Sequence, residues 1–174
     1  EKFSQTVLVT GASGFIGSHV CRHLITSGYR VRALVRGSQS LGLDSHASLE
    51  YLSGDLQKPA SLIAACDSVD IVVHLAGIAH ANNISEKSLF DINTVGTKSL
   101  LNAAISQNVK KFVYLSSTLA ETLDDRGHPT TAYGTSKLKA EKLLLEAHNA
   151  SSINALVLRP VSYTQLTLPT NREV

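Results

Sequence analysis

Methionine is absent from the 174-residue chain, and cysteine and long apolar runs are scarce. The two cysteines, Cys21 and Cys66, are too few for a disulfide framework and are typical of a reducing compartment. Histidines and a glycine interrupt the longest apolar stretch, 70–81, which is shorter than the about 18 residues that span a membrane. The first residues show no signal-peptide pattern, and without an initiator methionine we expect that the chain does not begin at a natural start. These absences favour a cytoplasmic protein with no membrane partner.

The chain also lacks any block of charge of one sign. Its 16 basic and 14 acidic residues are spread along the sequence and give a net charge of +2, so nucleic acid is not an expected partner. Hydrophobic residues make up 43% and charged residues 17%, which suits a folded globular domain rather than a disordered chain. At this length we expect one domain with a sizeable core.

Short β-branched runs alternate with helical patterns through most of the chain. The expected strands are 6–10, 30–36, 49–54, 70–76, 111–117 and 153–159, and the expected helices are 15–28, 58–67, 86–108 and 132–149. Because parallel neighbours need a crossover, this alternation predicts an α/β fold with a doubly wound parallel sheet in three layers, α/β/α. In the first helix we expect Ile16, Val20 and Leu24 to face inward, with Gly28 ending the helix.

The segment "TGASGFIGSH", residues 10–19, joins the first expected strand to the first expected helix. Gly11 permits a tight turn, Gly14 lets the backbone approach a pyrophosphate, and Gly17 lets the helix pack close to the strand. Free N–H groups and the positive end of the helix dipole then hold the phosphates. A tight turn without a ligand would use the same glycines, but the flanking strand and helix favour a dinucleotide site.

The end of the second expected strand bears on which dinucleotide is bound. An acid about 20 residues after the loop would bind the ribose 2′-hydroxyl of NAD. The chain has Val35 there, followed by Arg36, which can pair with the 2′-phosphate of NADP. Arg36 can equally be a solvated loop residue, so the sequence predicts NAD or NADP, with NADP slightly favoured.

Seven ordered motifs resemble those of the extended short-chain dehydrogenase/reductases, the NAD(P)-dependent epimerase/dehydratase family, over roughly residues 5–160. They are "TGASGFIG" (10–17), "GDL" (54–56), "VVHLAG" (72–77), "NTVGT" (93–97), "YLSS" (114–117), "YGTSK" (133–137) and "LRP" (158–160). Each motif is weak alone, but their order along the chain is specific. The resemblance implies a Rossmann fold and an enzyme that uses a nicotinamide dinucleotide.

The resemblance also implies a catalytic trio. Tyr133 is the implied general acid/base, Lys137 binds the nicotinamide ribose and lowers the tyrosine pKa, and Ser117 orients the substrate oxygen. Thr118 takes the place of Ser117 if the register differs by one, and Asn93 supports the helix and a water near Lys137. A free tyrosine, with a pKa of about 10, is a poor base at neutral pH, so nearby cations are needed to favour the phenolate. Positions four apart share a helix face, so Tyr133 and Lys137 can point into one cleft.

The same resemblance implies which residues hold the cofactor. The Asp55 side chain and the Leu56 backbone would contact the adenine, and 72–77 would line the cofactor. The full implied set is Gly11, Ser13, Gly14, Phe15, Ile16, Gly17, Arg36, Asp55, Leu56, Leu75, Ala76, Gly77, Asn93, Tyr133 and Lys137.

Other polar residues receive a structural interpretation. His19 and His23 lie one turn apart, but nothing metal-like accompanies them, so no metal site is predicted. His74 is expected to end a strand in the core rather than to act in catalysis. The gap of 16 residues between Ser117 and Tyr133 is shorter than in many nucleotide-sugar epimerases, which leaves the exact substrate open.

The last residues, 161–174, depart most from the family. Where the family continues into a substrate-binding domain, the chain reads "VSYTQLTLPTNREV", so we expect a non-native or flexible tail after a cofactor-binding domain at 1–160, with no C-terminal substrate domain. The leading hypothesis is a truncated part, with little or no turnover of its own, of an NAD(P)-dependent nucleotide-sugar epimerase, dehydratase or 4-keto reductase. The expected substrate is a UDP-sugar, which would undergo transient hydride transfer at C4.

Two other hypotheses stay open. One is an NADPH-dependent carbonyl reductase of the dihydroflavonol-reductase or steroid-dehydrogenase kind, which Arg36 favours because one-way reduction suits NADPH. The other is a non-catalytic dinucleotide-binding module, against which the intact trio argues. The resemblance also implies that the parent protein is a homodimer, formed through the helices at 86–108 and 132–149.

Overall fold

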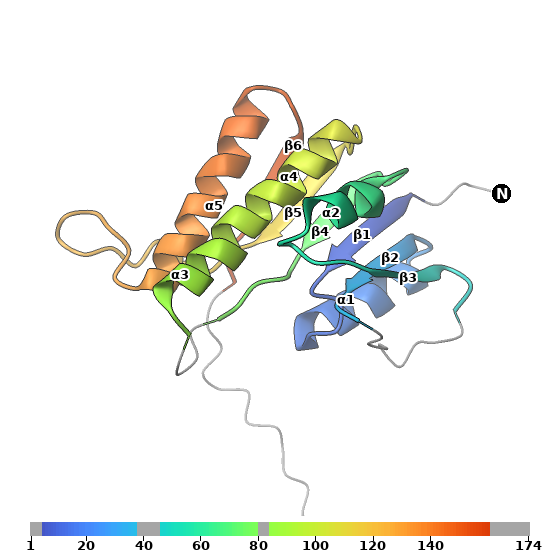
Figure 1. Cartoon of the computed structure of the whole chain (residues 1–174), viewed down its shortest axis with the longest axis horizontal. Coiled ribbons are helices and arrows are strands. Elements are labelled where there is room, and N and C mark those ends of the chain that lie inside the picture. The colour runs from blue at the N-terminus through green and yellow to red at the C-terminus, as the bar shows by residue number, and fades with distance from the viewer. Residues whose placement is uncertain (1–4, 38–45, 80–83, 161–174) are drawn as a thin grey trace, which may run out of the picture.

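The computed structural model describes residues 5–37, 46–79 and 84–160, and at its centre lies one parallel β-sheet (Figure 1). Its six strands follow the order β3-β2-β1-β4-β5-β6, and every neighbouring pair is parallel. The strands are β1 (Thr6–Thr10), β2 (Arg30–Val35), β3 (Leu49–Ser53), β4 (Ile71–His74), β5 (Lys111–Leu115) and β6 (Asn154–Leu158). The predicted strands are confirmed; β1 has the predicted bounds, and the others end slightly earlier.

Helices cover both faces of this sheet (Figure 1). They are α1 (Phe15–Thr26), α2 (Pro59–Cys66), α3 (Glu86–Leu89), α4 (Thr97–Ser106) and α5 (Ala132–Asn149). On one face, Val7 and Val9 of β1 pack in a core with Cys21 and Ile25 of α1. On the other face, Leu8 belongs to a second core that contains buried residues of α2, α4 and α5. Alternate residues of β1 therefore reach two cores, as in the predicted three-layer Rossmann arrangement.

The inward face of α1 differs from the prediction. The buried residues of this helix are Gly17, Cys21 and Ile25. Ile16 is 47% exposed, and Val20 and Leu24 are only partly buried, so the inward stripe is shifted by one position. The reason is steric: Gly17 must lie directly against the preceding glycine loop, and this contact fixes the rotation of the helix. The predicted end is confirmed, because Gly28 follows the helix with a φ of +86°.

The helical pattern at 86–108 is not one α-helix, contrary to the prediction. Between α3 and α4 the chain forms a π-helical segment, η1 (Phe90–Gly96), and α4 ends at Ser106. Such segments are rare and occur frequently at functional sites. Hydrophobic periodicity did not reveal this segment, in which the Thr97 hydroxyl donates a hydrogen bond of 2.6 Å to the Asn93 carbonyl at the junction of η1 and α4.

The carboxyl ends of the parallel strands meet at one edge of the sheet. The strand order reverses beside β1, whose neighbours are β2 and β4, and ligands of such sheets bind in the crevice at this reversal. Over residues 5–37, 46–79 and 84–160, the structure contains no helix long and apolar enough to cross a membrane. The predicted tail, 161–174, lies outside the described residues.

Candidate active site

The glycine loop lies between β1 and α1 and is shaped by close backbone contacts. Gly11 has a φ of +68°, and a Cβ there would lie 2.7 Å from the backbone nitrogen of Ala76. A Cβ on Gly17 would lie 2.1 Å from the Gly11 carbonyl oxygen. Gly14 begins the helix with no side-chain cap, so N–H groups of the first turn remain free to bind an anion. The loop is thus a cradle that side chains would fill, and it fits a dinucleotide pyrophosphate.

A pocket at the carboxyl edge of the sheet extends from this loop across β1, β2 and β4. Of the residues predicted to bind the cofactor, those that line it are Gly11, Ser13, Gly14, Arg36, Asp55, Leu56, Leu75, Ala76 and Gly77. The lining residues that the sequence reasoning missed are Thr10, Leu34, Val35, Gly54, Gln57, Ile78 and Ile92. Several of them end a strand or directly follow one, so a position at the carboxyl end of a predicted strand could have indicated them.

The remaining predicted cofactor residues lie outside this pocket. The side chains of Phe15 and Ile16 are exposed on α1 and do not line the pocket, so their role toward a phosphate stays a prediction. Gly17 is buried beneath the loop, where it sets the helix position rather than contacting the pocket. Asn93, Tyr133 and Lys137 lie farther along the sheet edge; a Cβ on Gly77, in the pocket wall, would lie 3.8 Å from the Lys137 Nζ.

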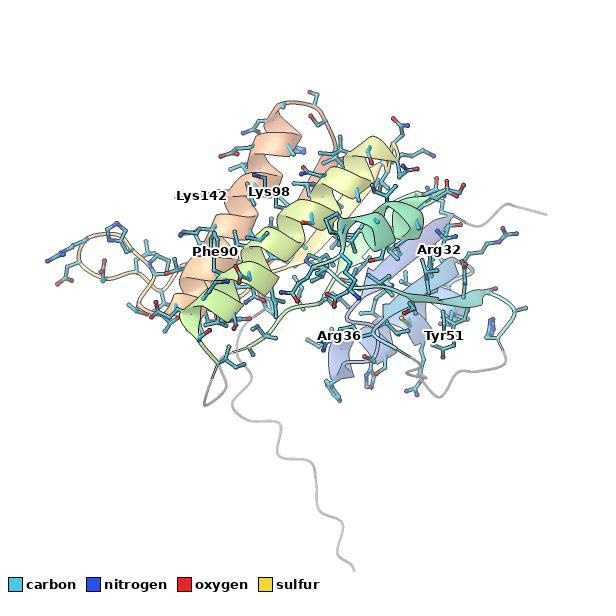
Figure 2. All side chains as sticks on the ribbon, viewed as in Figure 1. Arg32, Arg36, Tyr51, Phe90, Lys98 and Lys142 are labelled. Carbon is cyan, nitrogen blue, oxygen red and sulfur yellow. The ribbon has the colours of Figure 1, made fainter. Side chains whose placement is uncertain are left out.

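Arg36, labelled in Figure 2, follows β2. It lines the pocket where the adenosine end of a dinucleotide is expected. Its side chain is exposed, and it has no hydrogen-bond or ion-pair partner among the residues that the structure describes. Val35 takes the position of the expected acid and is 4% exposed, so it offers no ribose ligand. The guanidinium is therefore free to pair with an anionic group in the pocket.

The three predicted catalytic residues come from two neighbouring segments. Ser117 follows β5 and caps the short 3₁₀ turn η2 (Thr118–Ala120), where its Oγ accepts a hydrogen bond of 3.2 Å from the Leu119 N–H. Tyr133 and Lys137 lie in the first turns of α5, whose N-cap is the Thr131 hydroxyl. The start of α5 packs so closely on η2 that a Cβ on Gly134 would lie 2.2 Å from the Leu119 carbonyl oxygen. The glycine after Tyr133 permits this approach, and the motif reasoning gave it no role.

Tyr133 is half-buried, and two opposing effects act on its hydroxyl. Burial raises the pKa of Tyr133, whereas a hydrogen bond with the Ser117 side chain lowers it. The net result in this structure is a pKa above the ordinary tyrosine value, because burial outweighs the effect of Ser117. The predicted effect of Lys137 on this pKa stays a prediction for the dinucleotide-bound state.

Lys137 is 4% exposed and is held in place by the strand beneath it. Its ammonium donates a hydrogen bond of 2.6 Å to the Leu115 carbonyl and lies 4.4 Å from the centre of the Tyr114 ring. Burial lowers the pKa of Lys137 to about 8, and the negative charge of Glu141 opposes this shift. The ammonium is thus charged at neutral pH but titrates within reach of physiological conditions.

Asn93 joins the pocket wall to the catalytic helix. It is 1% exposed; its Oδ1 accepts a hydrogen bond of 2.9 Å from the Ile78 N–H, and its Nδ2 donates one of 3.0 Å to the Ser136 hydroxyl. The Ser136 hydroxyl in turn donates to the Tyr133 carbonyl at 2.7 Å. Asn93 therefore joins η1, the segment after β4 and α5. Its expected support of a water near Lys137 stays a prediction.

His74 is fully buried, as predicted, and it links three elements around the site. Its Nε2 lies 2.9 Å from the Thr97 hydroxyl, which already donates its proton to the Asn93 carbonyl, so Nε2 is the donor. Its Nδ1, 2.6 Å from the Thr10 hydroxyl, is then the acceptor. The same Thr10 oxygen accepts a hydrogen bond of 3.2 Å from the Ala76 N–H. Burial lowers the pKa of His74 to about 3, so this chain of bonds involves a neutral ring.

Metal ligands do not gather anywhere in the described part of the chain. Over these residues, no three side chains of His, Cys, Asp or Glu are close enough to hold a metal ion. His19 and His23 are both exposed on α1.

Comparison with known proteins identifies the family. The NAD dependent epimerase/dehydratase family matches residues 7–164. The chain belongs to this family. The resemblance seen in the ordered motifs is thereby confirmed.

Relatives in the epimerase/dehydratase family carry out different reactions. The UDP-glucose 4-epimerase of Vibrio cholerae is 30% identical over 175 residues, which cover 92% of this chain and 52% of that protein. The 3 beta-hydroxysteroid dehydrogenase/Delta 5-->4-isomerase of Mycobacterium tuberculosis is 30% identical over 171 residues, 88% of this chain and 46% of that protein. MoeE5, solved in complex with UDP-glucuronic acid and NAD, has a TM-score of 0.77 and 30% identity over 88% of this chain and 54% of that one. The chain thus spans about half the length of these relatives.

Proposed function

We propose that the chain is the dinucleotide-binding part of an NAD(P)-dependent enzyme that epimerises, dehydrates or reduces a nucleotide sugar at C4, with a UDP-sugar as substrate. The observation that carries the proposal is the placement of Ser117, Tyr133 and Lys137 beside the dinucleotide pocket, at the edge of the sheet where ligands bind. The relatives that act on or bind UDP-sugars support the substrate class.

Each residue of the trio has a defined task in this chemistry. A bound dinucleotide, held by the glycine loop and the pocket, supplies the hydride acceptor and donor. Tyr133 takes the proton of the sugar hydroxyl while hydride leaves the same carbon, and it returns the proton when the ketone is reduced. The Ser117 hydroxyl donates a hydrogen bond to the reacting oxygen. The Lys137 ammonium favours the tyrosine phenolate and contacts the nicotinamide ribose.

The test uses both the chain and a longer protein that contains it. We expect the 174-residue chain to bind dinucleotide, measured by titration calorimetry, with little or no turnover. The longer protein, incubated with UDP-glucose or UDP-N-acetylglucosamine and dinucleotide, should give a product altered at C4, detected by NMR. Failure of the chain to bind either NAD or NADP would contradict the cofactor assignment. Binding without any sugar product would contradict the proposed substrate.

A carbonyl reductase is the second candidate, and the unpaired guanidinium of Arg36 is the observation that favours it. An NADPH-dependent enzyme would consume the dinucleotide in proportion to a ketone substrate, whereas an epimerase would regenerate it. Stoichiometric oxidation of NADPH by the longer protein with a steroid or other ketone would therefore favour this candidate. A binding module without catalysis is disfavoured, because it has no need of Ser117, Tyr133 and Lys137.

Replacing Arg36 with alanine should separate the two dinucleotides. We expect the Kd of the chain for NADP to rise about 10- to 100-fold, since a charge-assisted hydrogen bond to the 2′-phosphate is lost, while the Kd for NAD changes little. Arg22→Ala is the matched control, because Arg22 is an exposed arginine on α1 outside the pocket. Equal affinity of wild type and Arg36→Ala for NADP would show that Arg36 does not read the phosphate.

We further propose that the longer protein is a homodimer that pairs through the helices at 86–108 and 132–149. Exposed apolar side chains on these segments support the proposal: Phe90 is 39%, Val95 43% and Leu145 57% exposed. Burial of such side chains against a second copy would remove apolar surface from water.

A further inference from the structure

Glu141 is a buried carboxylate on α5, one turn after Lys137, and no motif in the sequence pointed to it. It is 6% exposed. The Ser116 hydroxyl donates a hydrogen bond to its Oε1, as does the Arg159 Nε at 2.9 Å, and the Arg159 Nη2 donates to its Oε2. Arg159 also pairs with Glu121, beyond η2. Burying a carboxylate costs free energy unless it is paired in this way, so these hydrogen bonds are needed to keep Glu141 buried and charged.

Two side chains of α5, one turn apart, form hydrogen bonds with two consecutive residues at the end of β5. Lys137 donates to the Leu115 carbonyl at 2.6 Å, and Glu141 accepts from the Ser116 hydroxyl. Ser117 is the next residue of the chain. Its distance from Tyr133, two turns before Glu141 on the same helix, therefore depends on how firmly the end of β5 is fixed to α5.

The cluster extends this fixation to the neighbouring strand. The Ser116 N–H donates a hydrogen bond of 2.7 Å to the Leu158 carbonyl at the end of β6, and Arg159 follows directly. The Glu141 carboxylate thus accepts hydrogen bonds from residues at the ends of both β5 and β6. Arg159 carries the contact on to Glu121, which follows η2.

Glu141 also supplies negative charge to Lys137. The ionisable groups on elements packed around Lys137 include His74 on β4, Tyr114 on β5, and Tyr133 and Glu141 on α5; Arg159, after β6, lies behind Glu141. On η1, which also packs on α5, Asp91 is paired with Lys87. Burial keeps His74 neutral and raises the pKa of Tyr114, so neither carries charge at neutral pH. Burial also raises the pKa of Glu141, whereas the Ser116 hydrogen bond and Lys137 lower it.

We propose that Glu141 is a positioning residue of this site, which fixes the Ser116–Ser117 segment against α5 and places a negative charge one helical turn from Lys137. The proposal rests on the proposed function for the roles of Ser117, Tyr133 and Lys137, but the contacts of Glu141 do not depend on which substrate is used. Removal of its charge should therefore alter Lys137 in the chain itself, without dinucleotide or substrate.

The experiment measures the protonation of Lys137 by NMR of lysine labelled with ¹³C at the ε-methylene, with its signal assigned by its loss in Lys137→Arg. In the wild-type chain we expect a midpoint near the pKa of about 8. Glu141→Gln should lower this midpoint, because a neutral amide no longer favours the ammonium. Glu146→Gln removes the same charge from an exposed position of the same helix and should leave it unchanged. A wild-type midpoint in folded Glu141→Gln would overturn the proposal.

A second variant covers the case in which Glu141→Gln does not fold. Arg159→Met removes the positive charge behind Glu141, so it should shift the Lys137 midpoint upward, opposite to Glu141→Gln. A downward shift or none would also refute the proposal. A purely structural role for the cluster predicts lower stability in these variants with no movement of the Lys137 midpoint.

Turnover distinguishes this proposal from the proposed function. In the longer protein, Glu141→Gln should lower kcat by about 10- to 100-fold through misplacement of the reacting groups, with little change in the KM for dinucleotide. If the Lys137 midpoint moves as expected but the wild-type longer protein turns over no nucleotide sugar, the proposed function fails and the role of Glu141 toward Lys137 stands. An unchanged kcat in Glu141→Gln would contradict the positioning role alone.

Discussion

Replacing Tyr133 with phenylalanine is expected to lower kcat of the longer protein by about 10²- to 10⁴-fold, the usual contribution of a positioned general acid or base. The change removes one hydroxyl from a half-buried ring and adds no atoms, so the fold and the dinucleotide pocket should be retained. Turnover of the UDP-sugar, followed by NMR of the product, measures the effect, and titration calorimetry measures the affinity for dinucleotide.

Tyr29→Phe is the matched control for this experiment. Tyr29 follows α1, packs against the core on that face of the sheet, and does not line the dinucleotide pocket. It should retain wild-type turnover. If Tyr133→Phe were as active as Tyr29→Phe, another group would have to carry the proton, and the assignment of Tyr133 would be wrong.

Replacing Gly11 with alanine is expected to abolish detectable dinucleotide binding and to destabilise the chain by more than backbone strain alone. A left-handed φ costs an alanine about 1–2 kcal/mol. At Gly11 the new Cβ would also lie 2.7 Å from the Ala76 nitrogen and 2.9 Å from its Cα, so backbone must move, at a further cost of about 1–3 kcal/mol. The phosphate cradle is distorted by that movement.

Gly28→Ala separates the two costs. Gly28 has a φ of +86°, in the same left-handed region, but a Cβ there meets nothing within 4 Å. The Gly28→Ala variant should therefore lose only the free energy of backbone strain, and it should keep its affinity for dinucleotide. Urea unfolding of both variants gives the free energies of unfolding, and calorimetry gives the affinities. If both variants lost the same free energy of unfolding, the backbone around Ala76 would have to move aside at no cost.

The parallel sheet and its helices could be predicted because they depend on local pattern. Apolar β-branched runs, helical periodicity and the glycines around α1 determined the strand bounds to within a few residues. The rotation of α1 could not be predicted from periodicity, since Ile16 is as apolar as the buried residues of that helix. Its exposure follows from the contact between Gly17 and the Gly11 carbonyl, which joins two parts of the backbone.

The site was predictable to the extent that its residues lie in ordered motifs. Ser117, Tyr133 and Lys137 were named from such motifs, but the contacts that hold them were not. Gly134 is important because its lack of a side chain lets α5 approach η2. In the sequence Glu141 looks like one of several charged residues on a solvated helix, although it accepts a buried hydrogen bond from Ser116. Long-range partners of this kind leave no signal in local spacing.

The wide turn of η1 has a consequence for which sequence changes this fold can accept. A π-helical turn contains one residue more than the α-helical turn it replaces, so deletion of one residue from Phe90–Gly96 would restore a regular helix. The same deletion would rotate the preceding residues by about 100° relative to α4 and uncouple Asn93 from Ile78 and Ser136. Substitution at exposed Val95 leaves the turn intact, whereas a change of length does not. Among descendants of this sequence, exposed positions of this segment such as Val95 should therefore vary in residue type, while Asn93 and the length of the segment stay constant.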